Sequence, residues 1–206
     1  MAAGDLAADK RVAARLKAWM CFADEAGQSL RPPKARTWSR RGHTPTVLVS
    51  GKGSGRVSLA GMIAARRGFR TRLIYRMLVG HGRKGEKKGF RERDLAGMVD
   101  AAHQQLGRAP IVLVWDNDTC HRDAEMKRLI AERDWLTVFY LPAYTPVLNP
   151  VEGVWSALKR SLGNLAPRGI DALAGLVRTR LRRMQYRSDG LFDGFIAETG
   201  LALEPP

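Results

Sequence analysis

The feature that most constrains the fold is the uninterrupted apolar run from Ile111 to Trp115, which is followed directly by Asp116. A run of this kind is typical of a strand that is buried on both faces of a sheet. A second apolar run, Trp19 to Ala23, is followed in the same way by Asp24. The sequence therefore predicts two buried strands that each end at a carboxylate, and the end of a strand is a common place for a functional side chain.

Further strands are predicted between and after these two. Arg56 to Ala65 and Thr71 to Val79 have strand-like composition and are expected to form an antiparallel meander, and Leu136 to Leu141 is expected to form the last strand. Arg31 to Pro45 contains too much proline, glycine and charge for regular structure and predicts a basic loop. This loop is expected to lead into a strand at Thr46 to Ser50 and a hairpin turn at Gly51 to Gly55.

Apolar residues at helical spacing predict the helices. The predicted segments are Leu95 to Leu106, Met126 to Ile130, Val151 to Leu162, Ile170 to Met184 and Leu191 to Ile196. Asn149 is a good N-cap and Pro150 suits the first position of a helix, so the third of these helices is expected to begin there.

The order of these elements predicts an α/β fold, with a mixed five-stranded sheet whose first three strands are antiparallel and whose two faces carry helices. We expect an N-terminal helical segment at residues 1–18, a main domain at 19–187 and a C-terminal helical tail at 188–206.

The charge of the chain favours a polyanionic partner. Lys and Arg number 35 against 20 Asp and Glu, which gives a formal charge of +15. The excess is concentrated in two segments: residues 66–93 hold eleven basic and two acidic residues, and residues 159–187 hold eight basic residues and Asp171. A generally basic surface explains segments so poor in acids less readily than nucleic-acid binding does.

The sequence also favours an intracellular protein. No apolar run approaches the roughly 20 residues of a membrane span, and the first ten residues lack the core of a signal peptide. Cys21 and Cys120 have neither metal-finger nor disulfide-framework spacing, which is typical of a reducing compartment. We therefore expect a cytoplasmic, nucleoid-associated protein with no membrane partner.

Three carboxylates are candidates for phosphoryl-transfer chemistry. Such chemistry needs acidic groups that converge on two Mg²⁺ ions about 3.5–4 Å apart, and Mg²⁺ prefers hard oxygen ligands. If the first and fourth strands are neighbours, Asp24 and Asp116 lie at one edge of the sheet, and Glu152 lies in the first turn of a later helix.

Each of these acids also has a simpler interpretation. Asp24 and Asp116 could be turn residues at strand ends, and Glu152 could be the capping-box partner of Asn149. Asp118 is a rival for Asp116 as the second ligand, since it would face the same side if the strand continued.

At this point the sequence resembles a known family, the DDE transposases of the IS630 group, which are related to the Tc1/mariner elements. The resemblance runs from about Trp19 to Leu191 and is carried by four blocks, which are residues 22–27, 38–45, 114–117 with His121, and 141–155. The last block is the most specific, and the offset of 36 residues from Asp116 to Glu152 is close to the family's spacing.

The resemblance implies an RNase H-like domain in which Asp24, Asp116 and Glu152 bind two Mg²⁺ ions, with Mn²⁺ as an alternative. Water and then a DNA 3′-hydroxyl would attack phosphodiesters in line, without a covalent enzyme intermediate. Asn117 and His121 would orient the site. The implied partner is double-stranded DNA, in the form of transposon inverted repeats and target DNA.

Basic residues of three regions would contact DNA phosphates, which position DNA without reading its sequence. They are Arg31, Lys34, Arg36, Arg40, Arg41, Arg83, Lys84, Lys87, Lys88, Lys159, Arg160, Arg178, Arg182 and Arg183.

Such transposases usually carry a helix-turn-helix domain ahead of the catalytic domain, whereas 23 residues precede Asp24 here. We therefore expect a homodimer or a partner that carries the helix-turn-helix domain. Two alternatives to a transposase remain open. One is an inactive or truncated DNA-binding remnant, and the other is an RNase H-like nuclease or resolvase.

Overall fold

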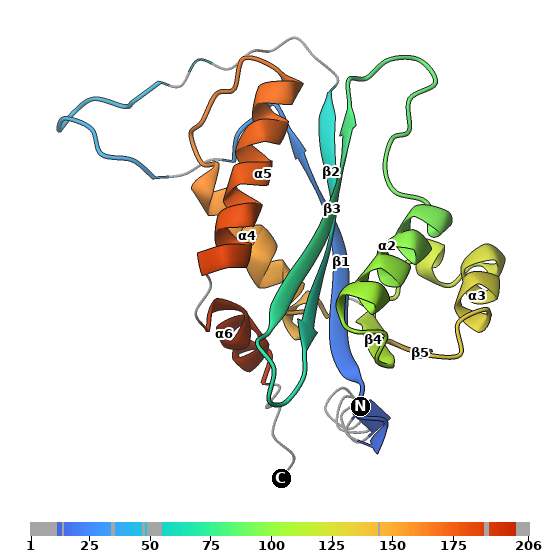
Figure 1. Cartoon of the computed structure of the whole chain (residues 1–206). Helices are drawn as coiled ribbons and strands as arrows, with labels where there is room; N and C mark the ends of the chain where they lie inside the picture. The colour runs from blue at the N-terminus through green and yellow to red at the C-terminus, as the bar shows by residue number, and fades with distance from the viewer. Residues whose placement is uncertain are drawn as a thin grey trace.

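A single five-stranded sheet forms the centre of the computed structural model of the chain (Figure 1). The structure describes residues 12, 13, 15–33, 36–46, 48, 55–143, 145–187 and 190–200. The strands are β1 (Trp19–Ser29), β2 (Arg56–Ala65), β3 (Arg72–Gly80), β4 (Ile111–Trp115) and β5 (Leu136–Tyr140), in the spatial order β3-β2-β1-β4-β5. β1, β2 and β3 pair antiparallel, whereas β4 and β5 continue the sheet in parallel, so the predicted mixed sheet is confirmed.

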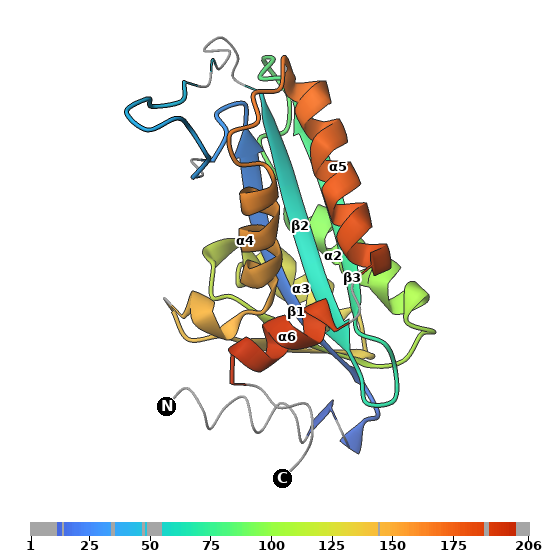
Figure 2. The ribbon, with the colours of Figure 1, turned by 90° about the vertical axis from the view of Figure 1, so that its left-hand side faces the viewer.

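Helices cover both faces of the sheet, as expected. α2 (Glu92–Gln105) and α3 (Ala124–Ala131) lie on one side, and α4 (Val151–Ser161), α5 (Ile170–Arg187) and α6 (Leu191–Glu198) lie on the other (Figure 1). In the rotated view, α4 runs along β1 and α5 runs along β3 (Figure 2). Two short 3-10 helices, η1 (Thr119–His121) and η2 (Pro146–Leu148), follow β4 and β5.

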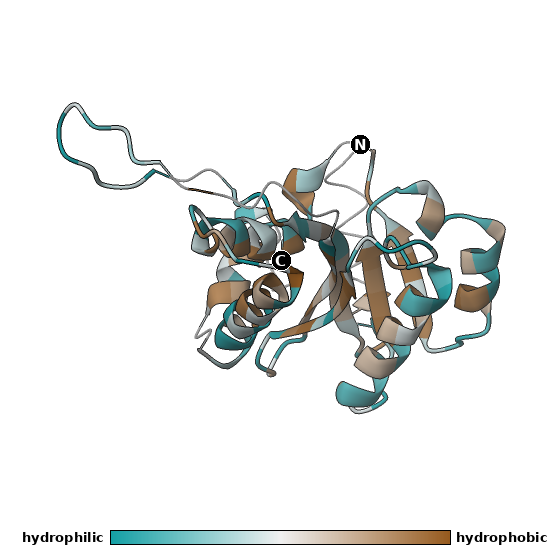
Figure 3. Ribbon diagram, turned by 90° about the horizontal axis from the view of Figure 1, so that it is seen from above, coloured by the Kyte–Doolittle hydropathy of each residue, from teal (hydrophilic) through white to brown (hydrophobic). Residues whose placement is uncertain are grey.

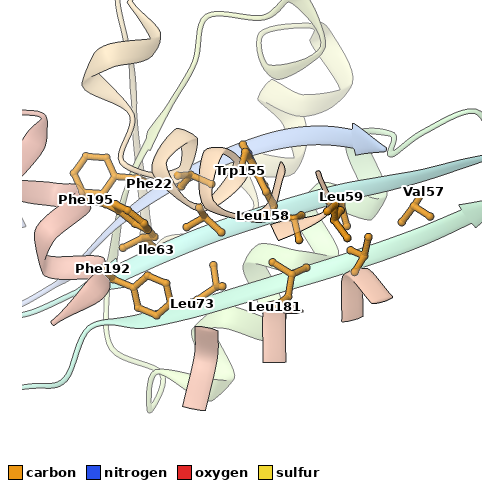
Figure 4. Close-up of a cluster of buried hydrophobic side chains, with 14 of the residues drawn as sticks. Phe22, Val57, Leu59, Ile63, Leu73, Trp155, Leu158, Leu181, Phe192 and Phe195 are labelled. Atoms are coloured by element: carbon orange, nitrogen blue, oxygen red, sulfur yellow. The ribbon is translucent and has the colours of Figure 1, made fainter. Parts of the chain in front are cut away.

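Each face of the sheet packs into its own apolar core. Because side chains of a strand alternate between faces, Met20 and Phe22 of β1 join the core beneath α4, α5 and α6, while Cys21 and Ala23 join the core beneath α2. Figure 4 shows part of the first core, and Figure 3 shows that hydrophilic residues predominate in the projecting loop around residues 36–46.

One strand is longer than the sequence predicted. The run that was expected to end at Asp24 continues to Ser29, so Asp24 lies inside β1 and not at its end. The reason is that the polar residues after Asp24 keep pairing with β2, as far as Ser29 opposite Arg56. Pairing with β4 stops earlier, at Phe22 opposite Val114. Asp24 therefore lies just beyond the position at which β1 loses its neighbour on one side.

Parts of two predicted segments fall outside the described residues. Most of the expected strand at Thr46 to Ser50 and of the hairpin at Gly51 to Gly55 is among them, and the described Thr46 and Leu48 belong to no strand. In the N-terminal segment, Val12, Ala13 and Arg15 are helical. None of the described helices is long and apolar enough to cross a membrane.

Two glycines allow α4 to approach its neighbours closely. A Cβ on Gly61 of β2 would lie 2.7 Å from the indole ring of Trp155, and a Cβ on Gly153 of α4 would lie 2.6 Å from the ring of Phe195 in α6. Since normal carbon contacts are near 3.5–4.0 Å, neither position accepts a side chain without movement of its neighbour. These contacts fix α4, and with it Glu152, between the sheet and α6.

We expect Gly153→Ala to destabilise the fold by about 1–3 kcal/mol, because the added methyl group overpacks the contact with Phe195. Gly97→Ala is the matched control, since Gly97 is also helical and a Cβ there would meet nothing within 4 Å. That substitution should stabilise the fold by about 0.4–1 kcal/mol. Urea unfolding measures both values, and equal effects of the two variants would contradict the close packing of α4 on α6.

Candidate active site

The sheet register places Asp24 and Asp116 next to each other. Phe22 pairs with Val114 in the parallel ladder of β1 and β4, so the same offset brings Asp24 level with Asp116 just beyond the last residue of β4. Neighbouring strands lie about 4.8 Å apart. The two aspartates therefore sit side by side where the β4 strand ends.

The start of α4 is attached to the same place. The Asn149 side-chain amide Nδ2 donates to the carbonyl oxygen of Ala23 at 2.9 Å, and its Oδ1 accepts from the backbone N–H of Val151 at 3.1 Å. The predicted cap is wrong by one residue, because Pro150 occupies the N-cap position and the helix begins at Val151. Asn149 thus connects the residue before Asp24 to the first residue of the helix that carries Glu152.

The capping interpretation of Glu152 does not describe the structure. The backbone N–H of Asn149, which a capping-box glutamate would bind, donates to the carbonyl oxygen of Pro146 at 2.9 Å instead. Glu152 lines a cavity of about 430 Å³ together with Asp24 and Asp116. The other lining residues are Asn117, Asp118, Thr119, Leu141, Pro142, Ala143, Thr145, Pro146 and Asn149. Acids from three elements thus converge on one cavity.

Asp24 is the most deeply placed of the three acids. Only 9% of the residue is exposed, and the indole Nε1 of Trp155 donates to its Oδ2 at 2.8 Å. Burial and then the neighbouring carboxylates of Glu152 and Glu25 raise the pKa of Asp24 to about 7, against the opposing effect of the Trp155 hydrogen bond. A cation in the cavity would stabilise the charged form of Asp24 and lower its pKa again.

Asp116 contacts a buried histidine. His121 Nδ1 lies 2.5 Å from Asp116 Oδ1, and His121 Nε2 lies 3.2 Å from Glu25 Oε2. Although burial by itself lowers the pKa of His121, its contacts with Asp116 and Glu25 raise the pKa to about 10. Glu25 was missed in the sequence, although it directly follows Asp24 in one of the blocks that carry the family resemblance.

The other residues near Asp116 have local partners. Asn117 lines the cavity and its Oδ1 accepts from Arg122 at 2.6 Å. The rival ligand Asp118 is the N-cap of η1, where its carboxylate accepts from the Cys120 backbone N–H and from the Thr119 hydroxyl, both at 3.2 Å. The hydrogen bond from the Cys120 backbone is the main cause that lowers the pKa of Asp118. Asp118 therefore serves a structural purpose at the rim of the cavity.

The predicted DNA-contacting residues lie in several places. Arg83, Lys84, Lys87 and Lys88 surround a second cavity of about 650 Å³, which Arg56 also lines. Arg160 lies in a groove that adjoins the acidic cavity and shares Glu152 with it. Lys34 lies outside the described residues. The remaining members of the set are exposed, and they are Arg31, Arg36, Arg40, Arg41, Lys159, Arg178, Arg182 and Arg183.

One member of this set is already paired. Lys87 Nζ lies 3.1 Å from Asp94 Oδ1, whereas Lys84 is exposed and has no acidic partner within the described part of the chain. The two lysines therefore differ in how freely they can meet a phosphate.

The donor set of the acidic cavity fits divalent cations. Asp24, Asp116 and Glu152 offer carboxylate oxygens, which Mg²⁺ and Mn²⁺ prefer, and the Asp116 side chain is 44% exposed and hence accessible. A bound cation would neutralise the repulsion that Glu152 and Asp116 exert on the buried Asp24 carboxylate.

Comparisons with known proteins agree with this geometry. A family model described as DDE superfamily endonuclease matches residues 19–173, which include all three acids. No curated protein matches the chain in sequence.

Solved structures of the Mos1 mariner system resemble the chain in fold. They include the Mos1 strand transfer complex (TM-score 0.56, 14% identity, 98% of this chain and 60% of that chain). The mariner Mos1 paired end complex with Mg gives a TM-score of 0.57 at 13% identity, over 98% of this chain and 61% of that chain. The paired end complex with Mn gives 0.56 at 13% identity, over 96% and 62%. These matches confirm the predicted RNase H-like fold, and the chain spans about three fifths of the length of the chains it matches.

We expect Asp24→Asn to stabilise the metal-free protein while abolishing its stabilisation by Mg²⁺. A carboxyl group whose pKa is raised on folding contributes stability at low pH that is lost as the pH rises through the folded pKa, here about 7. In a chelator at about pH 8, the variant should therefore be more stable by roughly 2–4 kcal/mol, and at about pH 4 the difference should vanish.

Thermal unfolding across this pH range measures the effect. Asp171→Asn is the control, because the Asp171 side chain is 81% exposed and its contact with His81 contributes little to stability. An Asp24→Asn variant that is destabilised at high pH would contradict the repulsion among the site carboxylates.

Proposed function

Because this chain belongs to the DDE superfamily endonucleases, we propose that it is the catalytic domain of a cut-and-paste DNA transposase, which cleaves phosphodiesters and transfers strands at transposon ends. The observation that carries the proposal is the convergence of Asp24, Asp116 and Glu152 on one cavity from β1, the end of β4 and the start of α4. The proposal is also supported by the resemblance of the sequence to IS630-type transposases and by the similarity in fold to the Mos1 strand transfer complex.

The three acids would hold two Mg²⁺ or Mn²⁺ ions, which when bound activate the attacking oxygen and stabilise the leaving one. The chain's own residues prepare this site. Trp155 holds Asp24 by its indole N–H, and Asn149 fixes the first turn of α4 and hence the position of Glu152. The opening of the cavity at the half-exposed Asp116 leaves room for a phosphate and an attacking hydroxyl.

Double-stranded DNA is the proposed substrate, and the basic residues around the two cavities are its proposed phosphate contacts. Arg160 lies in the groove beside Glu152 and would meet the backbone near the scissile phosphate. Arg83, Lys84 and Lys88, with Arg56, would hold a more distant part of the duplex. Such contacts provide affinity and register without reading bases.

We further propose that the chain acts as a homodimer or with a partner that carries a helix-turn-helix domain. The Mos1 complexes are described as paired end complexes, which supports an assembly of two subunits on DNA. A transposase of this kind would work at the nucleoid in the cytoplasm.

Asp116→Asn should abolish Mg²⁺-dependent cleavage of inverted-repeat DNA, because the site loses the charge of a central ligand. Asp118→Asn is the matched control and should retain cleavage, since Asp118 caps η1. Gel analysis of labelled DNA, including pre-cleaved ends, measures cleavage and strand transfer. Equal cleavage by Asp116→Asn and wild type would overturn the mechanism. Cleavage without strand transfer would indicate a nuclease or resolvase, and no Mg²⁺ binding would indicate an inactive remnant.

Binding to duplex DNA should weaken steeply with salt. The slope of the logarithm of the binding constant against the logarithm of the salt concentration should fall in magnitude by about 0.9 for each phosphate contact removed. Lys84→Gln should lower the slope by this amount, whereas Lys87→Gln should lower it less, because Lys87 is paired with Asp94. Fluorescence anisotropy over a range of salt concentrations measures the slopes. Affinity that does not depend on salt would contradict the basic residues as the contact surface.

A further inference from the structure

Glu25 is an acid beside the site whose position the proposed mechanism does not use. Because side chains alternate along β1, Asp24 points towards α4 and Glu25 points to the opposite face, where Cys21 and Ala23 meet the core beneath α2. Glu25 does not line the acidic cavity. Its Oε1 is buried without a hydrogen-bond partner, and its Oε2 faces His121 Nε2 at 3.2 Å.

His121 connects this face to the cavity. The ring is fully buried and stacks on Trp115, with centroids 4.0 Å apart and planes inclined by 21°. The backbone of His121 is also held, because its carbonyl oxygen accepts from the Tyr140 hydroxyl at 2.7 Å and its N–H donates to the Asp118 carbonyl oxygen at 3.1 Å. The remaining freedom of the side chain is a half-turn of the ring about the Cβ–Cγ bond, which keeps the stacking and exchanges the positions of ring nitrogens and carbons.

The two carboxylates fix that rotation. His121 Nε2 lies beside Glu25 Oε2 and Nδ1 lies 2.5 Å from Asp116 Oδ1, and each contact is an ion pair and not an aligned hydrogen bond. Asp116 Oδ1 is buried although the side chain as a whole is 44% exposed, so Oδ2 is the oxygen available to the cavity. Without Glu25, the ring could turn over and present carbon to Asp116.

We propose that Glu25 is a positioning residue, which through His121 holds one oxygen of Asp116 and thereby directs the other towards the divalent cation. This inference rests on the proposed function of the cavity. The alternative is that Glu25 binds a cation directly. Ligand atoms of Glu25, Asp116 and His121 all lie within 4.8 Å of one another, which is close enough for them to share an ion. Positioning is favoured because Glu25 lies on the far side of β1 and both ring nitrogens of His121 already face carboxylates.

The inference can be tested without catalysis by titrating the full chain with Mn²⁺. The electron paramagnetic resonance signal of free Mn²⁺ reports how much of the ion is bound at each step. We expect Glu25→Ala and His121→Phe each to weaken Mn²⁺ binding by about 10–100-fold, as is usual when a group that orients a metal ligand is removed. The double variant should bind Mn²⁺ no more weakly than whichever single variant binds it more weakly, since Glu25 acts only through His121. Glu125→Ala is the control, because Glu125 pairs with Arg93 on the surface of α3 and should leave binding unchanged.

A further loss on adding Glu25→Ala to His121→Phe would overturn the inference, because it would make Glu25 a ligand in its own right. Should His121→Phe not fold, Asp116→Asn replaces it as the background, and there too Glu25→Ala should cause no additional loss. If Asp116→Asn weakens Mn²⁺ binding but Glu25→Ala does not, positioning by Glu25 is wrong while the proposed function stands. If Asp116→Asn leaves binding unchanged, both are wrong.

Discussion

The parallel pairing of β1 with β4 is the constraint on which the site depends. It joins two strands that are about ninety residues apart in the chain and sets their register so that Asp24 and Asp116 become neighbours. The length of β4 matters as much as its register. Because β4 stops at Trp115, the edge of β1 beyond Phe22 is open, and the cavity occupies that opening. A longer β4 would fill it with backbone.

Gathering acids at this edge has an energetic cost, and the surrounding structure offsets part of it. Asp24 is buried against other carboxylates, which disfavours its charged form, while the indole of Trp155 stabilises that form. On the other face of β1, His121 lies between Glu25 and Asp116 and compensates their charges. The same tryptophan packs against Gly61, so the group that supports Asp24 also seats α4 on the sheet. Packing and electrostatics are therefore coupled through α4.

Much of the fold could be predicted because its apolar patterns are strong. The buried run at Ile111 to Trp115 and the helical stripes of α2, α4 and α5 appear in the structure where their periodicity placed them. The errors occurred where backbone pairing overrides side-chain pattern. β1 continues through polar residues to Ser29 because β2 supplies hydrogen bonds, and no apolar signal marks that extension. Likewise, α4 begins one residue later than expected, with Pro150 at the N-cap position, and no sequence signal marks the bond from the Asn149 amide to Ala23 in a distant strand.

The sequence by itself determined the elements, the basic character of the chain and the acids that follow or lie within its buried strands, since these depend on local composition and spacing. Only the tertiary structure decided which acids meet. It set Asp24 against Asp116 through a parallel register and placed Glu25 beside His121 on the opposite face. The reason is that a side chain's surroundings in a sheet come from neighbouring strands, whose register is fixed by contacts between residues far apart in the chain.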